Sequence, residues 1–289
     1  MIKKINNTIL SAIIASSSLT SMSAQAGLTN DVPSCYVANH YKFASRPYTK
    51  LAYILIDQTV LLDSELQKEA IENALHLMGS GTKFVVAEFS AFSQQRYLDV
   101  LNTGIIENQM TRDERDNVPV HSLAPFDSCM KGQIDFSLGM IRKDMTSAMS
   151  SASDTLAQSD IMMAMKTISE TIATDTAKQK VVFVVTDGLE NSSITSFYAH
   201  DGVRIIDSEK ELAKAKSDNM IGNFGGARIY VMGAGVMPPA KVGTQAERYG
   251  YRDPKTLDRL NRFWKEYFNQ SNAKLVEFGE PALVSPVGF

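Results

Sequence analysis

The stretch Val181-Val182-Phe183-Val184-Val185-Thr186-Asp187-Gly188 decides the fold, because an unbroken apolar run indicates a strand that is buried on both faces. A second such run, residues 51–56, leads directly into Asp57-Gln58-Thr59. In an open parallel sheet, ligands bind beyond the carboxyl ends of the strands, where the strand order reverses. We therefore expect Asp57 and Asp187 at one edge of a sheet. Between them in sequence lies Ser159, which precedes an apolar helical run.

Strand-like and helix-like segments alternate along the rest of the chain. Strands are predicted at residues 83–89, 95–101, 180–185, 227–232 and 273–278, with a small hairpin around His200-Asp201-Gly202. Helices are predicted at residues 63–78, 132–152, 160–174, 207–218 and 255–269. This alternation predicts an α/β fold: a doubly wound, mostly parallel sheet of about six strands with helices on both faces.

The first residues, 1–26, have the features of a secretory signal peptide. Lys3 and Lys4 form a positive start, residues 9–19 are apolar, and Ala24-Gln25-Ala26 matches a small-residue cleavage site. No later run approaches the roughly 20 apolar residues that span a bilayer. We therefore expect a bacterial periplasmic or secreted protein with no membrane span.

After the signal we expect an N-terminal extension, residues 27–50, and one domain, residues 51–289, because no Pro/Gly/Ser-rich linker divides the chain. Within that domain, insertions are predicted near residues 102–127, 189–206 and 233–254. The whole chain has 29 basic and 32 acidic side chains, and this balance does not suggest nucleic-acid binding.

Two cysteines, Cys35 and Cys129, both follow the signal. In an oxidising compartment, an even pair of cysteines predicts one disulfide, which would hold the N-terminal extension against the middle of the chain. The alternative is two separate buried thiols.

The order of these motifs resembles the von Willebrand factor A domain, a doubly wound sheet that carries a metal ion-dependent adhesion site. The resemblance covers about residues 51–278. The family's first motif, Asp-x-Ser-x-Ser, is matched by Asp57 and Thr59, its middle hydroxyl by Ser159, and its last aspartate by Asp187-Gly188. The third position of the first motif is Leu61, which cannot coordinate a metal.

The resemblance implies a divalent cation, Mg²⁺ or alternatively Mn²⁺ or Ca²⁺, held by Asp57, Thr59, Ser159 and Asp187. Such cations take oxygen ligands, and water can fill the position that Leu61 leaves. The alternative is that the two aspartates only order turns or cap helices. Asp160 is expected to cap the helix that follows it. Residues 190–193 are expected to form a solvated loop or to lie on the rim of the site.

These features favour a non-enzymatic binding module with no catalytic residues, which binds a partner protein in the bacterial envelope. One alternative is a metal-independent scaffold of the same fold for the assembly of an envelope machine. Another is a phosphohydrolase of the haloacid dehalogenase type, suggested by Asp57 at the end of its strand. That family needs a second aspartate, as acid and base, where this chain has Thr59.

Overall fold

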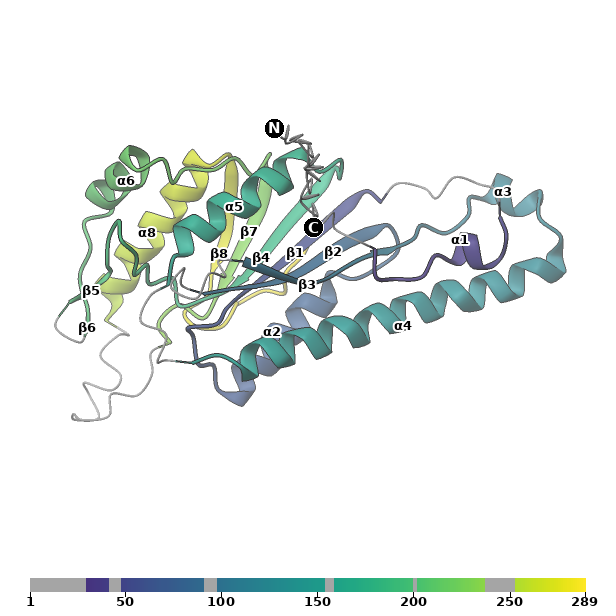
Figure 1. Cartoon of the computed structure of the whole chain (residues 1–289), viewed down its shortest axis with the longest axis horizontal. Coiled ribbons are helices and arrows are strands. Elements are labelled where there is room, and N and C mark those ends of the chain that lie inside the picture. The colour runs from purple at the N-terminus through teal and green to yellow at the C-terminus, as the bar shows by residue number, and fades with distance from the viewer. Residues whose placement is uncertain (1–29, 42–47, 91–97, 154–158, 200–201, 237–252) are drawn as a thin grey trace, which may run out of the picture.

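A computed structural model of the chain describes residues 30–41, 48–90, 98–153, 159–199, 202–236 and 253–289. Six strands form one sheet in the order β3-β2-β1-β4-β7-β8, and every neighbouring pair is parallel except β2 and β3 (Figure 1). The strands are β1 (Lys50–Asp57), β2 (Thr82–Phe89), β3 (Leu98–Ile106), β4 (Gln179–Val185), β7 (Ala227–Met232) and β8 (Ala273–Phe278). The predicted doubly wound, mostly parallel α/β sheet is confirmed.

Helices cover both faces of the sheet (Figure 1). One face carries α2 (Ser64–His76) and α4 (Val120–Ser150). The other carries α5 (Ile161–Thr174) and α8 (Pro254–Gln270), and α6 (Ser208–Ser217) packs beside α8. Alternate residues of β1 enter the two cores, which explains why its sequence is an unbroken apolar run.

The register of β1 and β4 places the two predicted motifs at the same level. Ile56 pairs with Val185, so the residues that follow, Asp57 and Thr186, leave the sheet side by side. The strand order also reverses between β1 and β4, because β2 lies on the outer side of β1 and β7 on the outer side of β4. The motifs therefore lie at the topological switch point of the sheet, where an open α/β fold binds its ligands.

The first predicted insertion, residues 102–127, resembles a loop in sequence but consists largely of strand and helix. β3 continues to Ile106, the short helix α3 (Arg112–Asp116) follows, and α4 begins at Val120 rather than near residue 132. Pro125 lies within α4, but in its second turn, where the carbonyl that loses its donor belongs to the exposed first-turn residue His121. The helix continues through this proline because the next residue, Phe126, is completely buried, and this packing offsets the cost of the proline.

The other two predicted insertions lie only partly within the described residues. In the first, strands β5 (Tyr198–Ala199) and β6 (Gly202–Val203) pair as the predicted hairpin, while residues 200–201 between them lie outside the described residues. In the second, residues 237–252 lie outside the described part, as do residues 95–97 of the predicted edge strand and the expected signal, residues 1–26. Among the described helices, none combines the length and the apolar character needed to cross a bilayer.

The predicted disulfide between Cys35 and Cys129 is confirmed, with the two Cα atoms 5.7 Å apart. It joins the short helix α1 (Cys35–Ala38) to α4. A separate apolar cluster surrounds it, in which Phe126 makes edge-to-face contacts with Tyr36 and Tyr41. We call residues 30–41, 107–119 and the first half of α4 the side lobe; it lies beyond one end of the sheet (Figure 1).

Candidate functional site

The carboxylate of Asp57 is the centre of the candidate site. It is buried, and its Oδ1 accepts hydrogen bonds from the amide and the hydroxyl of Thr59 at 2.9 and 2.6 Å. Its Oδ2 accepts hydrogen bonds from the hydroxyls of Ser159, at 3.1 Å, and Thr186, at 2.7 Å. All four donors are neutral. Burial raises the pKa of Asp57, and these hydrogen bonds oppose the rise only in part.

Asp187 is the second buried carboxylate at this edge. Its Oδ1 accepts a hydrogen bond from the amide of Leu189 at 2.8 Å, and its Oδ2 lies 3.3 Å from the donating hydroxyl of Tyr198. Burial and then the negative charge of Asp57 raise the pKa of Asp187 well above its ordinary range. The two aspartates therefore interact electrostatically, as their positions at the ends of neighbouring strands require.

The structure brings the four predicted residues to one place. Thr59 and Ser159 contact Asp57 directly, and Asp187 lies at the end of the adjoining strand. Leu61 lies beside this group in sequence, is 38% exposed, and has no oxygen in its side chain to contribute. Whether these residues bind a metal remains a prediction.

Two side chains at the site were not predicted. Thr186 was visible in the sequence as the residue before Asp187, and its strand-end position was the signal that it would face Asp57. Tyr198 had no such signal, because its contact with Asp187 depends on how the hairpin of β5 and β6 folds back onto the sheet edge.

Glu190 corrects two further predictions. It is 1% exposed, so at this residue the loop is not solvated. Its Oε2 accepts a hydrogen bond from the amide of Met162 in the first turn of α5, at 2.9 Å, while Asp160, although at the N-cap position, makes no side-chain capping bond. The capping role expected of Asp160 therefore belongs to Glu190, which joins the loop after β4 to the start of α5.

The turn after Asp187 is anchored from α8. The indole nitrogen of Trp264 donates a hydrogen bond to the carbonyl of Gly188 at 2.8 Å, and Trp264 is buried. Gly188 has a φ of 74°, and a side chain there would meet the indole at 3.0 Å. Glycine is therefore required after Asp187 both by the backbone conformation and by this close approach.

The donor set at this edge is made of oxygen atoms only: two carboxylates and the hydroxyls of Thr59, Ser159 and Thr186. Hard divalent cations such as Mg²⁺ prefer this chemistry. Within the described residues, no group of three or more His, Cys, Asp or Glu side chains is arranged to hold a metal ion. A cation here would therefore depend on hydroxyl oxygens and water as well as on Asp57 and Asp187.

Comparison with known proteins finds similarity only at the level of solved structures. No protein-family model matches the chain, and no curated protein matches it. An aerotolerance-related membrane protein from Bacteroides fragilis aligns over 79% of this chain and 90% of that chain, with 14% identity and a TM-score of 0.32. The PilB minor pilin from Streptococcus sanguinis aligns over 82% of this chain and 59% of that chain, with 13% identity and a TM-score of 0.34. Such distant likeness carries no functional argument; the strand order itself is compatible with a von Willebrand factor A-like fold.

Replacing Thr186 by valine is expected to lower the free energy of unfolding by about 1 to 3 kcal/mol, because the buried Asp57 carboxylate loses a hydrogen-bond donor. Thr82→Val is the matched control. The Thr82 hydroxyl is also buried in the sheet but has no hydrogen-bond partner among the described residues, so its removal should be neutral or stabilising. Urea unfolding with a chelator present measures both, and equal effects would contradict the role of Thr186.

Proposed function

We propose that the protein is a non-enzymatic binding module that holds a divalent cation, Mg²⁺ first and Mn²⁺ or Ca²⁺ alternatively, at the edge formed by Asp57 and Asp187. Thr59 and Ser159 complete the predicted ligand set, and Thr186 is a fifth oxygen-bearing side chain nearby. The bound cation would offer a free coordination position to a carboxylate of a partner protein. We further propose that this partner belongs to the bacterial envelope.

The observation that carries the proposal is the burial of two interacting carboxylates at the switch point of the sheet. Bringing two ionised carboxylates together in a buried site is unfavourable unless a cation or a proton neutralises part of their charge. The donors to Asp57 are all neutral, so they do not supply that charge. A divalent cation would supply the positive charge that these donors lack.

The location proposed for the protein is outside the cytoplasm, in the periplasm or secreted. The Cys35–Cys129 disulfide supports this proposal, because such bonds persist in oxidising compartments and are rare in the reducing cytosol. The expected signal over residues 1–26 agrees with it.

Saturating Mg²⁺ is expected to raise the melting temperature, because a ligand that binds only the folded state stabilises it by mass action. At a concentration one hundred times the dissociation constant the gain is about 2.7 kcal/mol, which corresponds to several degrees for a domain of this size. The double variant Asp57→Asn and Asp187→Asn should lose this increase. Differential scanning calorimetry with Mg²⁺ and with chelator measures it.

The control is the double variant Asp113→Asn and Asp116→Asn, which removes the same charge from the exposed surface of α3. It should keep the full Mg²⁺-dependent increase. A wild-type protein whose melting temperature does not respond to millimolar Mg²⁺, Mn²⁺ or Ca²⁺ would contradict the cation site and favour the metal-independent scaffold.

The scaffold is the second candidate, and two observations favour it: four neutral donors already satisfy Asp57, and Leu61 supplies no ligand. The hydrolase is a weaker candidate. Its mechanism needs a carboxylate where Thr59 stands, and the Thr59 hydroxyl instead donates to Asp57 itself. Turnover of a phosphate ester that Asp57→Asn abolishes would support it.

A further inference from the structure

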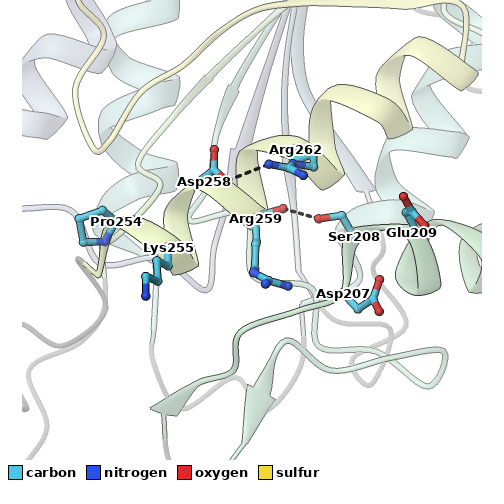
Figure 2. Close-up of a pocket in the computed structure, with 8 residues that line it drawn as sticks. All are labelled: Asp207, Ser208, Glu209, Pro254, Lys255, Asp258, Arg259 and Arg262. Atoms are coloured by element: carbon cyan, nitrogen blue, oxygen red, sulfur yellow. Dashed lines mark hydrogen bonds and ion pairs between the residues drawn. The ribbon is translucent and has the colours of Figure 1, made fainter.

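A pocket of about 460 Å³ lies between the N-terminal parts of α6 and α8 (Figure 2). Charged side chains dominate its lining, which consists of Asp207, Ser208, Glu209, Pro254, Lys255, Asp258, Arg259 and Arg262. Six of these eight residues carry a charge, so the pocket is suited to a charged ligand rather than to an apolar one.

The acidic and basic side chains of the pocket differ in how far they are already satisfied. Asp207 caps α6 and pairs with Lys210 at 3.2 Å, and Asp258 pairs with Arg262 at 3.2 Å. Lys255 has no hydrogen-bond or ion-pair partner among the described residues. Of the five N–H groups of the Arg259 guanidinium, Nη1 donates to the carbonyl of Ile206 at 3.1 Å.

Figure 2 shows Lys255 and Arg259 extending from the same side of α8, whereas Asp207 and Glu209 lie toward α6. The pocket therefore presents two cations that retain donors for a ligand. Among the three acidic residues that line the pocket, Asp207 and Asp258 form ion pairs within the described residues, and Glu209 does not. An anion would accept hydrogen bonds from Lys255 and from the Arg259 N–H groups other than the one that donates to Ile206.

The pocket is connected to the hairpin that contacts the candidate cation site. We call residues 197–199 and 202–206 the hairpin segment. Arg259 donates a hydrogen bond to the carbonyl of Ile206 at the end of this segment, and the Ser208 hydroxyl donates to the carbonyl of Arg259 at 2.8 Å. Within the hairpin segment, Phe197 packs edge-to-face on Phe263 of α8. Its neighbour Tyr198 contacts Asp187.

We propose that this pocket binds the carboxylates of an acidic peptide segment through Lys255 and Arg259. The chain as a whole has a net charge of −3, so long-range attraction does not explain binding of such a peptide, and the affinity must come from this local pair of cations. Carboxylates suit both partners, since guanidinium forms paired hydrogen bonds with them and ammonium donates in several directions.

The probe is a fluorescein-labelled hexaglutamate peptide, whose binding is followed by fluorescence anisotropy at low ionic strength. A chelator is present throughout, so the result does not depend on whether the cation site exists. Lys255→Glu replaces an attraction with a repulsion and is expected to weaken binding about fivefold. Glu209→Gln, which removes a like charge, is expected to strengthen binding about twofold.

Lys265→Glu is the matched control, because Lys265 is exposed on the same helix but does not line the pocket. It should change the affinity less than twofold by the same reasoning about exposed charges. Equal weakening by Lys255→Glu and Lys265→Glu would show non-specific attraction and overturn the proposal. Absence of binding to the wild-type protein at millimolar peptide would also overturn it, whereas loss confined to Lys255→Glu would support it.

Discussion

Replacing Glu190 by glutamine is expected to stabilise the protein at pH 8 while leaving its stability near pH 4 almost unchanged. Glu190 is buried, and its Oε1 has no hydrogen-bond partner among the described residues. Burial raises the pKa of its carboxyl from 4.5 to about 8, and the contacts with Ser192 and the Met162 amide offset burial only in part. Folding at pH 8 therefore requires either a proton on this group or a buried, poorly solvated charge.

The direction of the effect follows from proton binding. Between pH 4.5 and about 8 the folded state keeps the Glu190 proton and the unfolded state has lost it, so the free energy of unfolding falls as the pH rises. The stability that the Glu190 proton contributes is fully present below pH 4.5 and is lost above about pH 8. Each pH unit in this window changes the free energy of unfolding by about 1.4 kcal/mol. The stability that Glu190→Gln gains over the wild type at pH 8 therefore has an upper limit of about 5 kcal/mol.

Urea unfolding of the wild type and of Glu190→Gln across this pH range gives the free energy of unfolding of each protein as a function of pH. The two slopes are then compared. A chelator removes any contribution from a cation, and Asp57 and Asp187, whose pKa values are also raised, contribute equally to both proteins. Glu266→Gln, which changes an exposed glutamate on α8, controls for the change in net charge. Parallel pH profiles for the wild type and Glu190→Gln would contradict a buried, protonated Glu190.

The sheet and the centre of the candidate site were predictable because they follow from local sequence patterns. Residues 51–56 and 181–185 are apolar without interruption because both faces of β1 and β4 are covered. Parallel strands deliver the residues that follow them to the same edge, so the nearness of Asp57 and Asp187 required no tertiary detail. Ser159 was predicted through the family resemblance, and its contact with Asp57 agrees with that position.

The features that were missed depend on contacts between distant segments. A charged stretch with Pro125 resembles a loop, yet the burial of Phe126 and Met130 under the N-terminal extension makes it the start of a long helix. Glu190 resembles a solvated loop residue because its burial depends on the first turn of α5, 28 positions earlier in the chain. In both cases tertiary packing outweighed local composition.

Removing the Cys35–Cys129 disulfide with two alanines is expected to lower the free energy of unfolding by about 4 to 5 kcal/mol. The bond joins residues 94 positions apart, and a cross-link that closes a loop of this length removes much of the conformational entropy of the unfolded chain. The double variant is preferred to either single one, because a single replacement leaves a free thiol. Urea unfolding without reductant measures the loss, and the wild type with reductant provides an independent comparison.

The loss of free energy of unfolding in the double variant shows whether the disulfide stabilises the whole protein or only the side lobe. Apart from the disulfide, the Glu107 carboxylate accepts hydrogen bonds from the Ser34 hydroxyl and the Cys35 amide, and the Tyr36 hydroxyl donates to the carbonyl of Asn108. Hydrogen exchange at the backbone amide of residue 35 separates two outcomes. If the folded double variant keeps this amide protected while its global stability falls, the disulfide acts mainly on the unfolded chain, as predicted. If the amide loses protection and global stability falls by less than about 1 kcal/mol, the bond instead holds the lobe locally, and the entropic account would be wrong.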